Sequence, residues 1–416
     1  MTWAKTRLKH LCVDAGQYGL NISANDYAST GRRLIRTSDI DEMGWLRTRE
    51  SAVFVDAALD ARHELQAGDL LLSRSGTLGR AMLLQEIEEP STYAGYLVRF
   101  RPLLTTEPRF LAYVAASRGF QAAIEADAVT STIQNFNAER YANIEVLAPP
   151  LDEQRRIADF LDAETARLDR IVSIRQRQSA LHFERFSQLL DGVVMGDGDA
   201  LATIGHEGDP RDWTTGKVAR LFAIIPGFAF ASDEFVAADM GARLLRGINV
   251  APGQIDWSAE TVGWDLDSSP VDQRFHLRLG DLVVGMDRPW IGTGTRVALI
   301  AERDLPSLLL QRVACIRPRS KSTTQYLRWV LASSHFKFAL ESETTGVSVP
   351  HISGEQIGAF TYRLPKPDEQ EVLAALLDAQ QQAQTAQAEL VDRQLAVLAE
   401  RRQALISAAV TGEITV

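Results

Sequence analysis

Histidine and cysteine side chains are common metal ligands and reactive groups, and their spacing in this sequence matches no metal or redox motif. The two cysteines, Cys12 and Cys315, stand far apart and form no CxxC pair. The seven histidines form no HxxxH or HxH pair; they are His10, His63, His182, His206, His276, His335 and His351. Because metal clusters need several such ligands at short spacing, we expect no metal site.

The sequence also lacks clear matches to phosphate-binding loops and to nucleophile loops. The glycine-rich stretches GTLGRA (76–81) and GTGTRV (292–297) stand between expected strands rather than before a helix, which favours turn geometry over phosphate binding. The GK pair at 216–217 has Arg211 where a P-loop needs its first glycine, and no GxSxG is present. The adjacent prolines 149–150 are followed by leucine, so no prolyl-prolyl-aromatic methyltransferase loop is present either. The sequence therefore predicts no catalytic site and no cofactor bound by this chain.

Composition and charge limit the class of protein. The 416 residues are 45% hydrophobic and 24% charged, which is typical of globular chains and is enough for two or three domains. No apolar run of 18 residues and no apolar leader are seen, so we expect a cytoplasmic protein without membrane contact. The formal net charge is −10, but segments 1–150 and 201–365 carry only −2 and −1, which leaves room for a local basic face on either.

A segment written twice organises the chain. Residues 149–163 and 365–379 match at 8 of 15 positions, at a constant offset of 216. The register continues upstream, where FLAYVAASRGF (110–120) aligns with YLRWVLASSHF (326–336), and downstream to Gly196 and Gly412. Two further stretches match at an offset of 210 to 212: GRRLIRTSDI (31–40) with GARLLRGINV, and AGDLLLSRSG (67–76) with LGDLVVGMDR. Two copies of a 200-residue unit are too few for a solenoid and predict pseudo-two-fold symmetry.

The repeated tracts read as long helices. Prolines precede each tract, acidic residues fill the first turn, and no proline or glycine follows until Gly192 or Gly412. Apolar residues recur about every seven positions, which indicates a coiled-coil seam rather than two separate amphipathic helices. The expected seam is 376/377, 383, 390/391, 397/398 and 404/405 in the second tract, and 160/161, 168, 174, 181 and 189 in the first.

The segments between the tracts have mixed character. Strands are expected at 69–73, 96–101, 143–148, 281–284, 296–301 and 309–317. One helix is expected in each copy, at 108–125 and 323–342, and a polar loop follows each one, at 130–139 and 344–355.

The order of these parts resembles the specificity subunit of type I restriction–modification systems over nearly the whole chain. The most specific stretches are PPLDEQRRIADFLD from residue 149, PKPDEQ from residue 365 and ERRQALISAAVTGEI from residue 400, while GDLLLSRSG from residue 68 is similar in outline. The resemblance implies an α+β fold in which two tandem mixed α/β target recognition domains are separated by two long antiparallel coiled-coil helices. The expected boundaries are 1–150 for the first recognition domain, 151–196 for the first helix, 197–212 for a linker, 213–365 for the second recognition domain and 366–412 for the second helix.

The resemblance also implies a function. Each recognition domain would read one half of a split, asymmetric site in double-stranded DNA, and the helices would set the distance between the halves. Two methyltransferase subunits, which use S-adenosylmethionine to methylate adenine at N6, would bind this non-catalytic core, with a motor-nuclease subunit as an optional further partner. A split site needs two readers, which explains why the segment is written twice.

Polar and arginine side chains near the matching loops are the candidate DNA contacts, because base edges and phosphates are read by such groups. In the first domain they are Arg33, Arg36, Arg74, Ser75, Arg80, Thr130, Ser131, Gln134, Asn135 and Asn137. In the second they are Arg243, Arg246, Arg288, Trp290, Arg296, Ser348 and His351. The alternative for each arginine is a surface ion pair, for Arg36 and Arg246 a place on a buried strand, and for Trp290 core packing.

Two other classes of protein compete with this interpretation. One is an adaptor that uses the coiled coil to tether proteins without touching DNA. The other is a methyltransferase fused to its reader, which the absence of a cofactor loop disfavours. The sequence does not reveal the bases read, the spacer length or the oligomeric state.

Overall fold

The computed structural model describes residues 3–41, 44, 46, 52–56, 60–87, 89–128, 136–258, 260–292, 294–319, 323–341 and 350–416. The chain forms two compact units. Unit 1 comprises Met1–Gln176 and Val391–Val416, and unit 2 comprises Arg177–Leu390. Each long helix therefore contributes one half to each unit.

Unit 1 is built on two sheets. Its strands are β1 (Ala4–Arg7), β2 (Gln17–Tyr18), β3 (Arg32–Ile35), β4 (Val53–Val55), β5 (Leu70–Ser73), β6 (Ala81–Leu83), β7 (Ser91–Tyr93), β8 (Leu97–Phe100) and β9 (Glu145–Ala148). Its α-helices are α1 (Pro108–Ala116), α2 (Arg118–Ala128), α3 (Ala138–Asn143), the first part of α4 (Leu151–Met195) and the last part of α10 (Pro367–Thr411). The main sheet has the order β2-β8-β5-β6, the second has the order β4-β3-β7 with β3 parallel to β7, and β1 pairs with β9.

Unit 2 repeats this topology. Its strands are β10 (Thr214–Lys217), β11 (Phe222–Pro226), β12 (Val236–Ala237), β13 (Ala242–Leu245), β14 (Val250–Ala251), β15 (Gln254–Ile255), β16 (Val262–Trp264), β17 (Leu282–Gly285), β18 (Trp290–Ile291), β19 (Gly294–Thr295), β20 (Val297–Leu299), β21 (Ser307–Leu309), β22 (Val313–Pro318) and β23 (Thr361–Leu364). Its further helices are α5 (Gly198–Thr203), α6 (Val218–Leu221), α7 (Thr324–Ala332), α8 (Ser334–Glu341) and α9 (Gly354–Ala359). The main sheet, β11-β22-β17-β20, corresponds to β2-β8-β5-β6, and the parallel pair of β13 with β21 corresponds to β3 with β7. The predicted α+β fold, with two tandem mixed α/β domains and two long helices, is confirmed.

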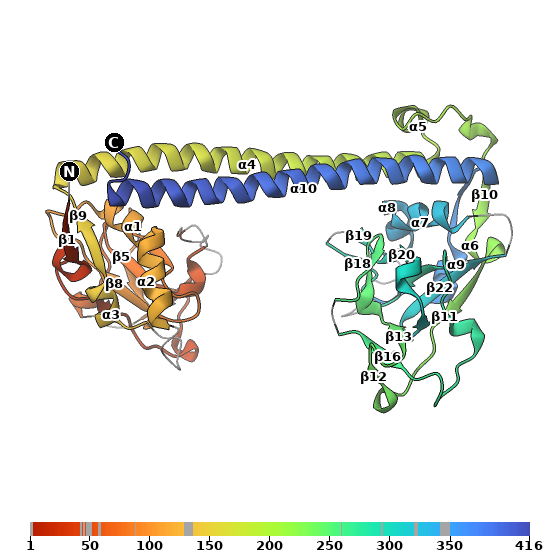
Figure 1. Ribbon diagram of the computed structural model, residues 1–416, viewed down its shortest axis with the longest axis horizontal. Helices are drawn as coiled ribbons and strands as arrows, with labels where there is room; N and C mark the ends of the chain where they lie inside the picture. The colour runs from red at the N-terminus through yellow and green to blue at the C-terminus, as the bar shows by residue number, and fades with distance from the viewer. Residues whose placement is uncertain are drawn as a thin grey trace. The chain divides into compact units, whose positions relative to one another are not determined.

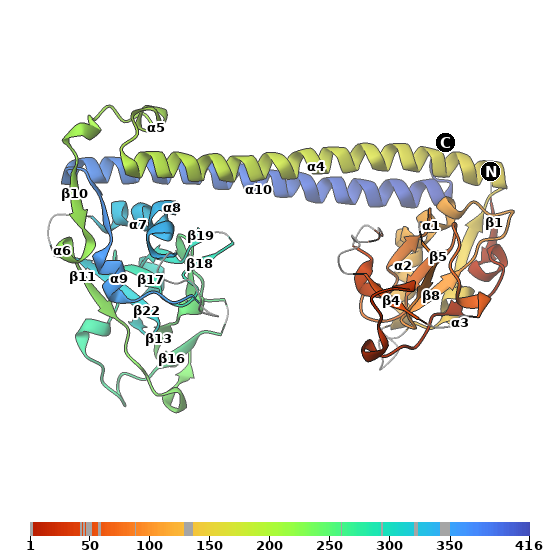
Figure 2. The ribbon, with the colours of Figure 1, turned by 180° about the vertical axis from the view of Figure 1, so that it is seen from behind.

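The central strand of each main sheet separates two apolar layers. Leu70 and Leu72 of β5 face a core that includes α1 and parts of α4 and α10, while Leu71 faces the core shared with the second sheet. In unit 2, Leu282 and Val284 face the helices and Val283 faces the other core. Because both faces are buried, the strand is a continuous apolar run without alternation. Figures 1 and 2 show α1 and α7 lying between the main sheet and the long helices of their own unit.

The helix expected at 108–125 is two helices, and so is its counterpart at 323–342, which corrects the prediction. Ser117 and Ser333 have extended backbones and interrupt the helices between α1 and α2 and between α7 and α8. Each serine donates its hydroxyl to a backbone carbonyl three residues earlier, at Val114 (2.7 Å) and Val330 (2.6 Å). This local bond competes with helix continuation at the same place in both copies.

Two predicted strands also need correction. The strand expected over 309–317 is the end of β21 followed by β22, with the turn that contains Arg312 between them. The strand expected over 143–148 begins only at Glu145, because Asn143 ends α3.

The two long helices run antiparallel within each unit. In unit 1, Ile157 and Leu161 of α4 share a core with Ile406 and Val410 of α10. In unit 2, Leu190 and Val193 of α4 share a core with Leu373 and Leu377. Residue numbers therefore increase along α4 in the direction in which they decrease along α10.

The seven-residue period of the seam is confirmed, but several predicted seam residues are wrong. On α10, Leu377, Val391, Leu398 and Leu405 face inward, whereas Ala383, Leu390, Val397 and Ala404 are exposed. On α4, Ile174 and Leu181 are exposed, and the seam passes instead through Arg175 and His182. A period of seven counted from Leu161 and Leu168 leads to 175 and 182, one residue beyond these apolar side chains.

The repeated signature links the globular part of each unit to its long helix, and we call this set of bonds the clamp. The Gln154 side-chain amide donates to the Pro149 carbonyl (2.8 Å) and accepts from the Glu107 N–H (2.9 Å). Gln370 makes the same bonds to the Pro365 carbonyl (2.8 Å) and the Thr323 N–H (3.2 Å). Both glutamines are buried, which explains why this residue stands in both copies.

A repeated aspartate completes the clamp. Asp162 accepts from the Tyr113 hydroxyl (2.7 Å) and pairs with Arg109 (2.6 Å). Asp378 accepts from the Trp329 indole N–H (2.9 Å) and pairs with Arg328. The carboxylate is kept in both copies while its aromatic and arginine partners differ.

Candidate nucleic-acid interface

Three segments that are distant in sequence meet at the end of β5 in unit 1. The Arg74 N–H donates to the Tyr96 carbonyl (2.9 Å), and the Arg74 carbonyl accepts from the Phe136 N–H (3.0 Å). We call Arg74, Tyr96 and Phe136 the loop junction of unit 1. Since β5 is fully buried and pairs with β8, the sheet fixes the backbone next to Arg74 and Tyr96.

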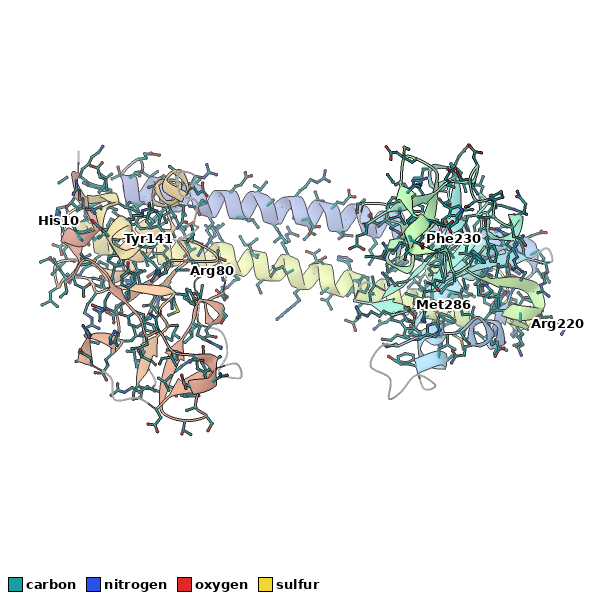
Figure 3. The ribbon with its side chains drawn as sticks, turned by 90° about the horizontal axis from the view of Figure 1, so that it is seen from below. His10, Arg80, Tyr141, Arg220, Phe230 and Met286 are labelled. Carbon is teal, nitrogen blue, oxygen red and sulfur yellow. The ribbon has the colours of Figure 1, made fainter. Side chains whose placement is uncertain are left out.

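Unit 2 has the same junction. The Met286 N–H donates to the Arg312 carbonyl (2.9 Å), and the Met286 carbonyl accepts from the Ile352 N–H (2.9 Å). Met286, Arg312 and Ile352 form the loop junction of unit 2, and Figure 3 labels Met286 there. The two junctions have the same backbone bonds to within 0.1 Å.

A buried tyrosine supports the junction of unit 1. The Tyr141 hydroxyl donates to the Ser73 carbonyl (2.7 Å) and accepts from the Gly79 N–H (3.0 Å), which holds both ends of the 73–79 loop. Burial raises the pKa of Tyr141, so the hydroxyl stays neutral and keeps its proton for this bond. Figure 3 labels Tyr141 and Arg80 in this unit.

The junction of unit 1 presents arginine, aromatic and small polar side chains. The Arg74 guanidinium lies over the Tyr18 ring, 4.7 Å from its centroid, and the Tyr18 hydroxyl accepts from the Ala138 N–H (3.0 Å). Tyr96 is 66% exposed. Ser75 precedes Gly76, whose φ of +73° is a left-handed conformation. An exposed aromatic ring beside an arginine is suited to stacking and to base-edge or phosphate contacts.

The junction of unit 2 presents charged side chains. Asp287 Oδ1 lies 2.6 Å from His351 Nδ1 and 3.4 Å from an Arg312 guanidinium nitrogen. The exposed Arg288 adopts a φ of +44°, and its N–H donates to the Pro350 carbonyl (2.8 Å). Sequence positions 75 and 287 thus carry serine and aspartate, and positions 96 and 312 carry tyrosine and arginine.

Two predicted contacts, Arg80 and Arg296, tether the junction loops to the neighbouring sheet. Arg80 donates to the Ile40 carbonyl (2.9 Å), and Arg296 donates to the corresponding Val250 carbonyl (3.1 Å). Burial and the nearby Arg288 charge lower the pKa of Arg296. Both guanidinium groups therefore link a junction loop to the second sheet of their unit.

The predicted contacts on β3 and β13 lie with the second sheet of each unit. Arg36 follows β3 and pairs with Asp39 (2.7 Å), and the hydrogen bond to this carboxylate raises the pKa of Arg36. Arg246 follows β13 and donates to the Glu260 carbonyl (3.0 Å). The remaining two are Arg33, 3.8 Å from Glu89, and Arg243, which stacks over Trp257 at 4.4 Å.

The other predicted contacts have varied positions. Asn137 caps α3 by accepting from the Arg140 N–H (2.8 Å), next to Phe136 of the junction. Trp290 packs against the core of unit 2 and lines a cavity of about 340 Å³ together with Phe186 and Trp329, as the core-packing alternative expected. Thr130, Ser131, Gln134, Asn135 and Ser348 lie outside the described residues.

The junction geometry adds four residues that sequence reasoning missed: Tyr18, Tyr96, Asp287 and Arg312. A signal existed for three of them. Tyr96 and Arg312 occupy equivalent places at the 216-residue offset. Asp287 aligns with the predicted contact Ser75 at the offset of 212, whereas Tyr18 is brought to its junction only by the folded backbone.

The described residues contain no cluster of three metal-ligating side chains. Within the same residues, no helix is both long enough and apolar enough to cross a membrane.

Comparisons with known proteins agree on one family. The family model for the type I restriction modification DNA specificity domain matches residues 56–178. The specificity subunit of the type I restriction enzyme EcoAI from Escherichia coli is 30% identical over 169 residues, which cover 41% of this chain and 28% of that protein. The MjaVIII specificity subunit from Methanocaldococcus jannaschii is 26% identical over 319 residues, 75% of this chain and 69% of that protein. The match to EcoAI thus spans less than a third of that relative's length.

Solved structures share the fold. A chain from a study of complex assembly and conformational transition of the type I R-M system has a TM-score of 0.76 at 20% identity, covering 99% of this chain and 98% of that chain. The HsdS subunit from Thermoanaerobacter tengcongensis has a TM-score of 0.53 at 20% identity, covering 99% and 97%.

Proposed function

We propose that this chain belongs to the family of type I restriction specificity subunits, which it resembles in sequence, and that it is the non-catalytic subunit that selects the DNA site of a type I restriction–modification complex. It reads a bipartite, asymmetric sequence in double-stranded DNA, one half with each recognition domain. It acts in the cytoplasm, where bacterial and archaeal DNA lies.

The observation that carries the proposal is the pair of loop junctions. Each recognition domain brings three loops together with the same backbone bonds, and the loops present different side chains in the two units. Two readers of one architecture and unlike chemistry are what an asymmetric split site requires. Arginines at or beside both junctions supply groups that contact phosphates and guanine edges, although the whole chain is acidic.

The partner subunits follow from the family. Two methyltransferase subunits bind this chain and supply S-adenosylmethionine and the methylation of adenine at N6, and a motor-nuclease subunit is a further partner. Exposed apolar side chains on the long helices support a docking role, because large apolar groups on an outer helix face favour a protein partner. In unit 1 these are Ile174 and Val397, and in unit 2 they are Leu181 and Leu390, each 47% to 61% exposed.

The test is competitive DNA binding by the chain together with its methyltransferase. A pool of randomised duplexes is expected to yield one bipartite sequence that scrambled competitor does not displace. Absence of DNA binding would favour the adaptor interpretation, and binding without any sequence preference would contradict the proposed selection of a DNA site. Methyl transfer from S-adenosylmethionine by the rigorously purified chain alone would overturn the non-catalytic assignment.

A further inference from the structure

The junction of unit 2 holds a cluster of three side chains from three different loops. Asp287 follows β17, Arg312 precedes β22, and His351 precedes α9. Asp287 Oδ1 accepts from both partners, at 2.6 Å from His351 Nδ1 and 3.4 Å from the Arg312 guanidinium. All three side chains are 39% to 59% exposed, so the cluster is open to a ligand from solvent.

Backbone strain is concentrated at the same place. Arg288 and Arg312 adopt φ values of +44° and +69°, and they are two of the three non-glycine residues with positive φ among the described residues. Side chains other than glycine are rarely held in this region unless the surrounding structure determines it, and such outliers cluster at functional sites. In unit 1, the position that corresponds to Arg288 is Gly76, for which the same conformation costs little.

The hydrogen-bonding capacity of the cluster is defined by Asp287. Because a carboxylate oxygen only accepts, Nδ1 of His351 carries the proton in the contact with Asp287, and in this tautomer Nε2 is an acceptor. Arg312 carries five donors, of which the bond to Asp287 uses one. The cluster therefore offers adjacent donors from Arg312 and an acceptor from His351.

This pattern complements one base pair in the major groove. A G·C pair presents the guanine N7 and O6 acceptors followed by the cytosine N4 donor. We infer that Asp287, Arg312 and His351 read a G·C pair in the second half of the DNA site, with Arg312 on the guanine, His351 on the cytosine and Asp287 as the positioning residue. This inference rests on the proposed function, and it applies to unit 2 alone, because unit 1 has Ser75 and Tyr96 in place of Asp287 and Arg312.

The test is enrichment of a randomised duplex library by the chain in complex with its methyltransferase subunits, followed by sequencing. The wild-type complex is expected to require a G·C pair at one position of the second half-site. Arg312→Lys keeps the charge but loses the two-pronged guanidinium, so discrimination at that position should fall by about 10-fold or more. Asp287→Asn should reduce discrimination at the same position while general affinity for DNA is kept, which loss of a structural group alone would not produce.

Two matched variants serve as controls. Arg220→Ala removes an exposed arginine from α6 in the same unit (Figure 3) and should leave every position of the motif unchanged. Tyr96→Ala alters the equivalent position in unit 1 and should change only the first half-site. Circular dichroism melts establish that each variant is folded.

The outcomes separate this inference from the proposed function. If the wild-type complex enriches no sequence at all, the proposed function fails. If it enriches a bipartite motif, and folded Arg312→Lys and Arg312→Ala variants keep the same preference at every position, the reading cluster is wrong while the proposed function stands.

Discussion

The two loop junctions differ in their side chains and agree in their backbone. Arg74 and Met286 sit at the same place, bonded to the same two neighbouring segments at the same distances, yet one is a cation stacked on a tyrosine and the other is an apolar residue beside an aspartate–arginine–histidine cluster. Main-chain bonds hold the loops in place whatever the side chains are. The side chains at a junction can therefore change without loss of the loop architecture.

The clamps show the opposite behaviour. Gln154 and Gln370 make identical bonds in the two units, and Asp162 and Asp378 each accept from one aromatic side chain and one arginine. The clamp glutamine and aspartate are the same in both copies, whereas the residues at the two junctions differ. The residues that are identical in the two copies therefore include those of the clamp but not those of the junctions.

Exchange of a whole recognition domain should give the largest effect. Replacing residues 1–150 with the corresponding domain of a related subunit is expected to change the first half-site completely and to leave the second half-site intact, because each junction lies within one domain. Library enrichment by the hybrid complex measures this. A hybrid that changes both halves would show that reading is shared between domains.

Removal of the clamp aspartate should affect the two units unequally. Asp378→Ala leaves Arg328, whose side chain is 12% exposed, without its carboxylate, and burial already lowers the pKa of this arginine. We expect a loss of about 2 kcal/mol in the free energy of unfolding. Asp162→Ala should cost about 1 kcal/mol or less, because Arg109 is 32% exposed and keeps Glu107 and Asp159 as partners.

Urea denaturation of the full chain measures this difference. Tryptophan fluorescence favours unit 2, since Trp213, Trp257, Trp264, Trp290 and Trp329 lie there, while circular dichroism follows both units. Equal losses for the two variants would mean that the exposure of the arginine does not decide the cost.

Removal of the clamp glutamine should affect both units alike. Gln154→Ala and Gln370→Ala each deprive a half-buried backbone N–H and a buried carbonyl of their partner. The expected cost is about 1–2 kcal/mol after the higher helix propensity of alanine is allowed for. Gln188→Ala is the matched control on an exposed face of α4 and should be close to neutral. A clamp variant as stable as this control would contradict the assigned role.

The two cysteines, one in each unit, allow local unfolding of the two units to be compared without any substitution. Burial raises the pKa of Cys12 to about 12 and raises that of Cys315 further, so at pH 8 almost no thiolate is present in the folded state. Labelling should then follow local unfolding, and Cys12, 5% exposed, should react before Cys315, which is fully buried. Timed alkylation with peptide mass spectrometry measures the two rates. Rapid labelling of either thiol in the native protein would contradict this packing.

Much of the fold was predictable, because it is written in patterns of several residues. The central strands are apolar runs after Gly-Asp turns, and the long helices carry a period of seven without proline or glycine. A feature decided by one side chain was not predictable: the helix break at Ser117 depends on where its hydroxyl bonds. The seam passes through Arg175 instead of Ile174 because it keeps the count of seven from Leu168, whereas the prediction followed the apolar residues.

The candidate site was predicted only in part for the same reason. Arg74, Ser75, Arg288 and His351 were found because they lie in or beside loops that repeat or are polar. Tyr18 reaches Arg74 across a fold whose loop geometry the sequence does not state. Arg80 and Arg296 resembled contacts by residue type, but the carbonyl groups that they bind belong to segments about 40 residues away in sequence.

The glutamine clamp has a consequence for how such proteins diversify. Its amide holds the globular domain by a main-chain N–H, at Glu107 in one copy and Thr323 in the other, and these different residues both cap the first helix of their domain. Because the glutamine bonds to a main-chain N–H, it can hold any domain whose first helix begins with the same backbone conformation. If each domain reads DNA as proposed, recombination between genes near this point would place a foreign domain on an unchanged helix, and a lineage would acquire a new target sequence in one step rather than by gradual substitution.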